Sequence, residues 1–302
     1  MLSYLHSFHA GNHADILKHV TLLYVLEYLN KKEKPYSFFD THAGSGLYDL
    51  MAENALKTGE ARLGIERLLS EYKKNPPEMP SALAPYLDFV KKSLEKGFYP
   101  GSPAFEISFS KKGSFINLTE LHRTEFESLK KNVERLKPSC SVNLQNGSGW
   151  NILKKNIPPA IKRGAILCDP SYEEKSDYTD AAELLSAAHK KWSAATVLLW
   201  YPLLANKSEE IENMKQSILS AAKKRDSHTE ILDVRLLVDT EDSHTETTLE
   251  KSIGSEKPRL YGSGMFAVRP CWGLKEHLES VLPYLADLLG KEGNGSYKIE
   301  LF

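Results

Sequence analysis

Apolar and polar positions alternate along the chain in a way that predicts helices and strands in turn. The first helix should begin near Asn12, with Asp15 three residues further on in a spacing like that of a capping box. Its apolar positions recur at helical spacing: Ile16, Val20, Leu23, Leu26 and Leu29. One face of this helix should therefore lie in the core.

Short apolar runs and amphipathic runs follow each other over most of the remaining chain. Strands are predicted at 36–40, 114–120, 141–146, 164–168, 196–202, 230–238 and 264–270. Helices are predicted at 123–136, 149–157, 180–192 and 209–225. This alternation is typical of an α/β fold in which a mostly parallel sheet carries helices on both faces. The last two of the seven strands have no helix between them, so we expect an antiparallel hairpin at the sheet edge.

Residues 48–100 differ from their surroundings. They are polar and rich in helix formers, and their prolines cluster at positions 76, 77, 80 and 85. We expect a small helical subdomain here, inserted into a core made of residues 1–47 and 101–302. The chain has no internal repeat and no low-complexity segment.

Composition favours a soluble, cytoplasmic protein. Hydrophobic residues make up 41% and charged residues 26% of the 302 positions, which is ordinary for a globular protein. No apolar run approaches the roughly 18 residues of a membrane helix, and the N-terminus lacks the layout of a secretory signal. The three cysteines have spacings that fit neither a disulfide framework nor a zinc site.

The net charge of −1 neither supports nor excludes a nucleic-acid partner. Local basic patches exist at 151–163, which contains four cations and no acid, and at 189–192. Each patch is either a solvated face or a surface that contacts phosphate.

Ligands of such sheets bind outside the carboxyl ends of the strands, so polar residues there are candidates for a binding site. The segment 38–49 is the first such place: a buried strand runs into Asp40, and Gly44 and Gly46 follow. Either this is an ordinary glycine turn or the backbone approaches a ligand closely. A dinucleotide site would have a third glycine where Asp49 stands. Its absence favours a nucleoside cofactor without a pyrophosphate.

Two further strand ends carry polar residues. Glu120 ends one strand and suits hydrogen bonding to ribose hydroxyls, although it also fits the start of the next helix. Asn146 ends another strand and can bond an adenine edge, although Asn146-Gly147 also reads as a turn.

The fourth place is the segment 164–178, where a buried strand stops at Asp169, Pro170, Ser171 and Tyr172. Asp and Pro are ordinary turn residues. They also suit a pocket for an aromatic amine, whose delocalised lone pair makes it a poor nucleophile. The Asp169 carboxylate and the Pro170 carbonyl can accept hydrogen bonds from the two N–H groups of the amine, and Tyr172 offers a face on which a base can stack. Proline stiffens the loop, so the acceptors are placed in advance.

The N-terminus concentrates rings and bases, namely Tyr4, His6, His9, His13, Lys18 and His19. His9 and His13 are four residues apart, but no cysteine or acid stands at metal spacing, so no metal site is predicted. Such residues suit stacking on RNA and gripping its backbone.

These features together resemble the class I, Rossmann-like methyltransferases that use S-adenosylmethionine on an adenine N6. More narrowly, the chain resembles the RlmJ family. The matching stretches are MLSYLHSFHAGNHADILKH, DTHAGSGLY, KTGEARLGI, YPGSP, LTELH and the tail Gly262–Trp272. That family methylates one adenosine of 23S ribosomal RNA on N6, and residues 48–100 match its helical insertion.

The resemblance implies a role for particular residues. Asp169, Pro170 and Tyr172 would be catalytic, and Tyr4, His6 and Lys18 would lie near the RNA. The implied contacts to the cofactor come from His19, His42, Ser102, Glu120, Asn146 and Gly147, and the predicted site adds Gly44, Gly46 and Asp169. The expected partner is 23S ribosomal RNA, naked or at an early stage of assembly. We expect a monomer that binds no membrane and has no obligatory protein partner.

The sequence departs from the family pattern at three places. Ser171 replaces the second proline of Asp-Pro-Pro-Tyr, Asn146 stands where an acid is usual, and the tail reads VRPCW, with Arg269 and Cys271. Two alternatives therefore stay open: the same chemistry on DNA or another RNA, and a non-catalytic RNA-binding protein on a decayed methyltransferase fold.

Overall fold

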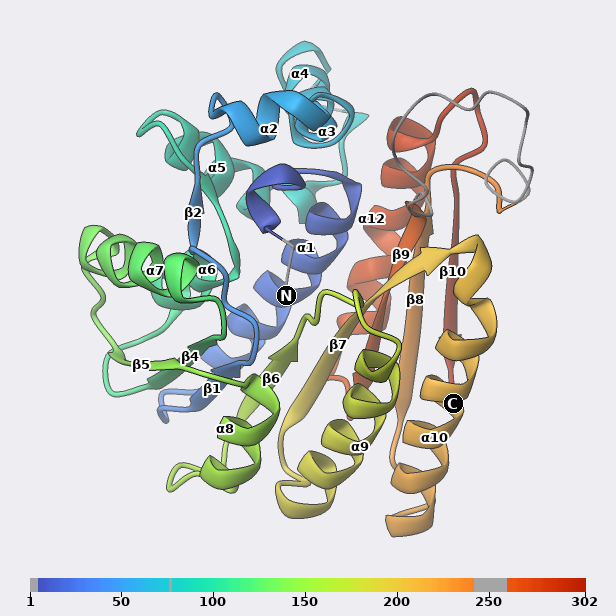
Figure 1. Ribbon diagram of the computed structural model, residues 1–302. Coiled ribbons are helices and arrows are strands. Elements are labelled where there is room, and N and C mark those ends of the chain that lie inside the picture. The colour runs from blue at the N-terminus through green and yellow to red at the C-terminus, as the bar shows by residue number, and fades with distance from the viewer. Residues whose placement is uncertain (1–4, 76–77, 242–259) are drawn as a thin grey trace.

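One eight-stranded sheet organises the molecule, as seen in the computed structural model, which describes residues 5–75, 78–241 and 260–302 (Figure 1). The strands lie in the order β10-β8-β9-β7-β6-β1-β4-β5. Their bounds are β1 Ser37–Asp40, β4 Phe115–Glu120, β5 Ser141–Asn146, β6 Gly164–Cys168, β7 Thr196–Leu204, β8 Ile231–Leu237, β9 Leu260–Val268 and β10 Ser296–Leu301. The predicted α/β class is confirmed.

The five strands from β5 to β7 are parallel to their neighbours. β9 then lies antiparallel between β7 and β8, and β10 pairs antiparallel with β8. The expected antiparallel edge is confirmed, but the count of seven strands was wrong. The outermost strand is β10, and most of its side chains are exposed. A strand that buries little surface carries no apolar run, so the hydrophobic pattern missed it.

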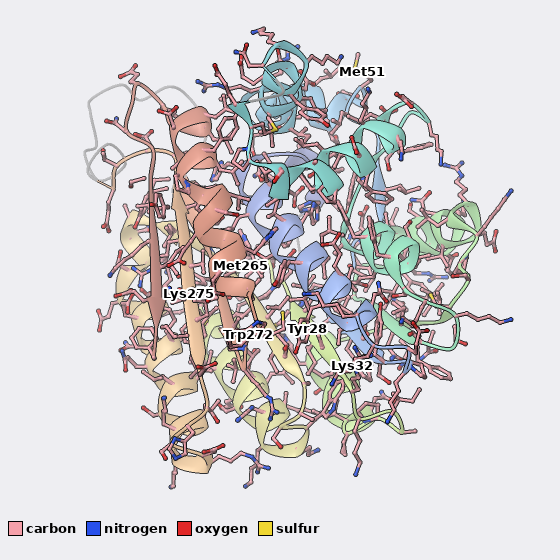
Figure 2. The ribbon with its side chains drawn as sticks, turned by 180° about the vertical axis from the view of Figure 1, so that it is seen from behind. Tyr28, Lys32, Met51, Met265, Trp272 and Lys275 are labelled. Carbon is pink, nitrogen blue, oxygen red and sulfur yellow. The ribbon has the colours of Figure 1, made fainter. Side chains whose placement is uncertain are left out.

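Helices cover both faces of the sheet. The face toward the viewer in Figure 1 carries α8 (Gly149–Asn156), α9 (Ser176–Lys191) and α10 (Ser208–Arg225). The other face carries α1 (His13–Asn30), α6 (Ser102–Phe109), α7 (Arg123–Leu136) and α12 (Leu274–Leu289). Figure 2 views the molecule from behind and shows α12 and α1 in front of the sheet. Strand side chains alternate between the two cores: Phe38 packs in the core of α1 and α12, and Phe39 in that of α9.

The first helix begins as predicted. The Asn12 side-chain oxygen accepts the backbone N–H of Asp15 (3.0 Å), which caps the helix. The Asp15 carboxylate does not reach back to Asn12, because it accepts the N–H of Gly11 (2.9 Å) instead. α1 is buried on nearly all sides, since α6, α12 and the sheet surround it.

Between β1 and β4 the chain forms a helical segment. It is bounded by β2 (Leu47–Tyr48) and β3 (Tyr99–Pro100), which pair antiparallel with each other. Its helices are α2 (Glu53–Thr58), α3 (Glu60–Leu63), α4 (Ile65–Lys74) and α5 (Ala84–Leu94). Ile65 and Leu87 share the core of α1 and α12. The division into a core and an inserted subdomain at 48–100 stays a prediction.

Short 3₁₀ helices lie at His6–Phe8, Ser81–Leu83 and Ala205–Lys207. In the described parts of the chain, no helix combines the length and apolar character needed to span a bilayer.

Candidate functional site

The strand order brings three carboxylates to one edge of the sheet. β1 lies between β4 and β6, and Asp40 at its end is in register with Leu118 of β4 and Leu167 of β6. Glu120 and Asp169 each lie two positions beyond these partners. Because the next helices cross to opposite faces here, this edge is the switch point where ligands bind in open α/β sheets.

The turn after β1 is tied to β4 through Glu120. One carboxylate oxygen of Glu120 accepts the N–H of Gly44 (2.9 Å), and the other accepts the N–H of His122 (2.6 Å). Burial raises the pKa of Glu120. Gly44 has a φ of 58°, and a Cβ there would lie 2.2 Å from the Tyr48 hydroxyl oxygen. Only glycine fits this turn without strain.

Asp40 is buried beneath the same turn. Its carboxylate accepts the N–H of His42 (3.0 Å) and the hydroxyl of Ser102 (2.7 Å). Burial raises the pKa of Asp40 to about 6. Ser102, which the sequence assigned to the site only by resemblance, is thus joined to the end of β1.

Glu106 lies one turn further along α6 and was not singled out from the sequence. It is fully buried, and neither carboxyl oxygen has a hydrogen-bond partner in the described structure. Burial, and after it the neighbouring Asp40, raise the pKa of Glu106 well above the usual range. No sequence signal separates Glu106 from an ordinary helix acid.

A chain of charged groups leads from the N-terminus to Asp169. The Lys18 ammonium lies 2.6 Å from Asp169 Oδ2 and 2.9 Å from Asp15 Oδ1. Asp15 Oδ2 accepts from His6 Nε2 (3.0 Å). Burial favours a higher pKa for Asp15, but His6, Lys18 and His19 hold it well below its usual range. The structure therefore brings His6 and Lys18 together with Asp169.

Asp15 is the residue that the sequence reasoning missed in this chain of contacts. It was interpreted only as part of a helix start. A usable signal existed, because Asp15 and Lys18 are three residues apart and must share one face of α1.

The ring of Tyr172 lies in the core rather than at the surface. It is 7% exposed, its hydroxyl donates to the carbonyl of Trp200 (2.8 Å), and its centroid is 4.7 Å from that of Tyr178. Its φ of 54° is unusual for a residue with a side chain. Its stacking role stays a prediction.

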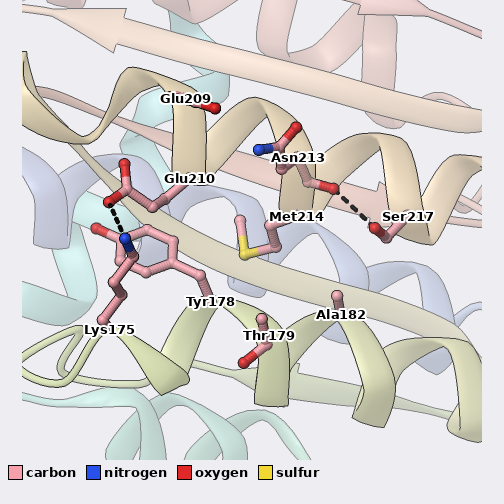
Figure 3. Close-up of a pocket in the computed structure, with 9 residues that line it drawn as sticks. All are labelled: Lys175, Tyr178, Thr179, Ala182, Glu209, Glu210, Asn213, Met214 and Ser217. Carbon is pink, nitrogen blue, oxygen red and sulfur yellow. Dashed lines mark hydrogen bonds and ion pairs between the residues drawn. The ribbon is translucent and has the colours of Figure 1, made fainter.

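A pocket of about 280 Å³ lies between α9 and α10, and Tyr178 forms part of its wall (Figure 3). Its lining consists of Lys175, Tyr178, Thr179, Ala182, Glu209, Glu210, Asn213, Met214 and Ser217. An ion pair between Lys175 and Glu210 (3.6 Å) crosses it. Asp40, Glu120 and Asp169 do not line it, so the predicted site and this pocket are separate.

Asn146 is exposed, and its amide is already engaged. The Nδ2 group donates to the carbonyls of Glu120 (2.8 Å) and Leu121 (3.2 Å). Gly147 follows, and its N–H donates to the same Glu120 carbonyl (3.0 Å). A carboxylate could accept but not donate here, so asparagine suits the loop where an acid is usual.

The two predicted histidines differ in burial. His42 is half-buried, and its ring meets that of Trp150 edge-on at 4.9 Å. His19 is fully buried, with Nδ1 3.2 Å from the Tyr99 hydroxyl. Burial lowers the pKa of His42 to about 4 and that of His19 to about 3, so both rings are neutral. A direct cofactor contact of His19 stays a prediction.

Tyr4 lies outside the described residues. His9 contacts Glu60 (2.9 Å) rather than His13. Among the described residues, no group of histidine, cysteine and acidic side chains is placed to hold a metal ion.

The candidate site thus consists of carboxylates around a glycine turn, with one buried lysine held between two of the chain's aspartates. This arrangement suits ribose hydroxyls, amines and a positively charged group. It lacks the lysine that grips phosphates in nucleotide-triphosphate sites.

Comparison with known proteins identifies the group to which the chain belongs. Residues 33–302 match the family model described as "Ribosomal RNA large subunit methyltransferase D, RlmJ". "Ribosomal RNA large subunit methyltransferase J" of Escherichia coli K12 is 32% identical over 98% of this chain and 96% of its own length. The protein of the same name from Haemophilus influenzae is 32% identical over 99% and 98%.

A solved structure has a similar fold over nearly the whole chain. The crystal structure of protein LPL1258 from Legionella pneumophila is 29% identical, covers 97% of this chain and 98% of its own, and has a TM-score of 0.79. On the sequence match over nearly its whole length, the chain belongs to the RlmJ family of ribosomal RNA methyltransferases.

Proposed function

We propose that this protein transfers a methyl group from S-adenosylmethionine to the N6 amino group of one adenosine in 23S ribosomal RNA, before the ribosome is assembled. The observation that carries the proposal is the position of Asp169-Pro170 at the end of β6, beside the glycine turn and the Glu120 carboxylate. The family supports it, because the relatives bear the name of ribosomal RNA large subunit methyltransferases.

The residues at the sheet edge fit the proposed cofactor. The glycine at position 44 lets the backbone approach a ligand closely, and a side chain there would fill the turn. Acidic groups suit ribose hydroxyls and the positive charge of a sulfonium. We assign binding to His42, Gly44, Gly46, Glu120, Asn146 and Gly147, with Ser102 and His19 as supporting residues. Bound S-adenosylmethionine would supply an electrophilic methyl group.

Asp169 and Pro170 would orient the target amine. Lys18 holds Asp169 Oδ2, and Asp169 Oδ1 accepts no hydrogen bond from the described residues, so it is available for an N–H of the adenine. The Pro170 carbonyl would accept the second N–H. The amine lone pair then points toward the methyl group, and catalysis rests on positioning and electrostatics. The proton leaves to solvent after transfer, and no metal takes part.

Tyr172 would stack on the flipped adenine only after a rearrangement of residues 170–172. The left-handed φ of Tyr172 costs free energy, which such a rearrangement would recover. Ser171 leaves this loop less rigid than the proline that is usual in the family. His6, Lys18 and Tyr4 would contact the RNA beside it. The protein would act as a monomer in the cytoplasm.

Asp169→Ala tests the proposal. We expect methyl transfer to a 23S ribosomal RNA transcript to fall at least about 100-fold, because the acceptor for the amine is lost. Calorimetry should show S-adenosylmethionine bound within a factor of about three of the wild type. The control is Asp287→Ala, which changes an exposed acid of α12.

Three results would contradict the proposal. Full activity of Asp169→Ala would remove the assigned role of the carboxylate. The absence of heat with S-adenosylmethionine in the wild type would favour a non-catalytic RNA-binding protein. Unchanged 23S ribosomal RNA masses in a strain without the gene, together with altered adenine methylation of DNA, would favour a DNA substrate.

A further inference from the structure

The edge of the sheet opposite the candidate site collects the C-terminal ends of three helices. α8, α9 and α10 each lead back to the start of a strand, so their last turns lie together at the lower end of the molecule in Figure 1. α9 connects the two edges: it starts shortly after Asp169 and runs for 16 residues, or about 24 Å at the usual rise of a helix.

Positive charge is concentrated at this end. The segments 151–163, 186–195 and 219–230, together with Arg269, contain ten lysines and arginines but only two acids, in a chain of net charge −1. We use the term basal surface for the exposed cations Lys154, Lys155, Lys162, Lys190, Lys191, Lys224 and Arg225. The rest of the chain must therefore be acidic on balance.

Direct contacts join the segments that carry these cations. Lys191 donates to the Lys154 carbonyl (3.0 Å), and the Trp192 ring nitrogen donates to the Lys162 carbonyl (2.6 Å). Arg269 donates to the Ser193 carbonyl (2.7 Å). The basal surface is thus one continuous patch across the ends of α8 and α9 and the loop before β6.

The end of α10 belongs to the same patch. His189 of α9 is buried, and burial, Arg225 and Arg269 together lower its pKa. α10 packs against α9 and ends at the same edge of the sheet, so Arg225 in its last turn lies near the end of α9.

Helix ends alone do not explain the patch. Cations in a last helical turn are stabilised by the helix dipole, which accounts for all of the seven except Lys162. Lys162 lies in a loop and gains nothing from a helix. None of the seven cations forms an ion pair with an acid in the described structure. Gathering like charges costs free energy, which a bound polyanion would offset by releasing counterions.

We infer that the basal surface binds the phosphate backbone of RNA, as a second contact with a segment of the substrate other than the one that carries the target adenosine. The inference rests on the proposed function for the identity of the RNA. It gives the enzyme two RNA contacts, about one helix length apart, on opposite edges of the sheet. The target base would bind at the edge that carries Asp169, and the phosphate backbone of another RNA segment would bind at the opposite edge.

Charge reversal at the end of α9 tests the inference. We expect Lys190→Glu/Lys191→Glu to weaken binding of a fluorescent 23S ribosomal RNA transcript about tenfold, and to flatten the dependence of log K on log salt by roughly one to two units. The conservative variant Lys190→Arg/Lys191→Arg should bind like the wild type, since phosphate contacts need charge.

The matched control is Lys91→Glu/Lys92→Glu. These are also two adjacent exposed lysines in the last turn of a helix, here α5. We expect the control to change affinity less than about twofold. A loss as large as that of the α9 variant would show a general charge effect and overturn the inference.

Two further measurements separate this inference from the proposed function. Methyl transfer to a short oligonucleotide that carries only the target should be the same in the α9 variant and the wild type. If no RNA is methylated by the wild type, the proposed function fails while transcript binding still tests the surface. Unchanged transcript binding by the α9 variant, with lost binding to vesicles of anionic lipid, would assign the surface to a membrane and overturn the inference.

Discussion

At the residue scale, Asn146 shows how one departure from the family pattern is accommodated. Its amide donates to the carbonyls of Glu120 and Leu121, and so joins the ends of β5 and β4. An acid at this position would have to bond the ligand and leave these carbonyls to water. With asparagine in place of the usual acid, the loop is held by these two hydrogen bonds and carries no negative charge at this position.

Asn146→Asp should lower the free energy of unfolding by about 1 kcal/mol, since two hydrogen bonds of an exposed group are lost. Urea unfolding at pH 7 measures this. Asn213→Asp makes the same chemical change at an exposed position of α10 and should leave the stability within about 0.5 kcal/mol of the wild type. Equal stability of Asn146→Asp and the wild type would show that water replaces the amide without cost.

At the element scale, the turn between β1 and β2 holds the site together. Glu120 of β4 accepts from Gly44, while the N–H of Ser45 donates to the Tyr48 hydroxyl (3.1 Å). A short turn with partners on two strands keeps its backbone amides at fixed positions before any ligand binds.

Gly44→Ala should destabilise the protein by roughly 2–3 kcal/mol, because the added Cβ combines a left-handed φ with a collision against the Tyr48 hydroxyl. Tyr48→Phe removes the colliding oxygen. The double variant should therefore be more stable than the sum of the single effects predicts, by about 1 kcal/mol in thermal or urea unfolding. Strictly additive effects would show that backbone strain alone excludes alanine.

Elements with a strong local pattern were predicted well. The predicted bounds of α7 (Arg123–Leu136) and β5 (Ser141–Asn146) agree with the structure, and β6 begins and ends where its apolar run does. α6, α12 and β10 were not predicted. α6 is short and buried nearly all round, and β10 is mostly exposed, so neither has the two-sided pattern from which elements are recognised.

At the scale of the whole molecule, buried and half-buried histidines make the stability depend on pH. Burial lowers the pKa of His19 to about 3 and the pKa values of His13, His42 and His277 to about 4, against 6.5 for a free imidazole. These rings charge first in the unfolded chain, so the stability they contribute is full above pH 6.5 and is lost as the pH falls. Asp40 acts in the opposite direction, since its raised pKa favours the fold below about pH 6.

His19→Asn should make the fall in unfolding free energy between pH 7 and pH 5 smaller by about 2 kcal/mol than in the wild type. The readout is the difference between two pH values, so a general loss of stability in the variant does not affect it. His228→Asn, at an exposed position, should leave the pH dependence as it is in the wild type. The same pH dependence in all three proteins would show that His19 is not buried as a neutral ring.

The sequence by itself determined the fold class, most of the elements and the strand-end residues from which the site is built. Periodicity, a helix cap and a carboxylate after a buried strand are local signals, because they depend on residues that are neighbours in the chain. Asp40, Glu120 and Asp169 could all be selected in this way.

Only the tertiary structure decided which of these residues meet. The Lys18–Asp169 ion pair joins residues 151 positions apart, and the burial of Tyr172 depends on Trp200 and Tyr178. The basal surface likewise arises because three helices end at one edge of the sheet. Such contacts follow from strand order and packing, which no local pattern encodes. The neighbours of the basic segments and of the turn at Asp169 are therefore seen only in the folded molecule.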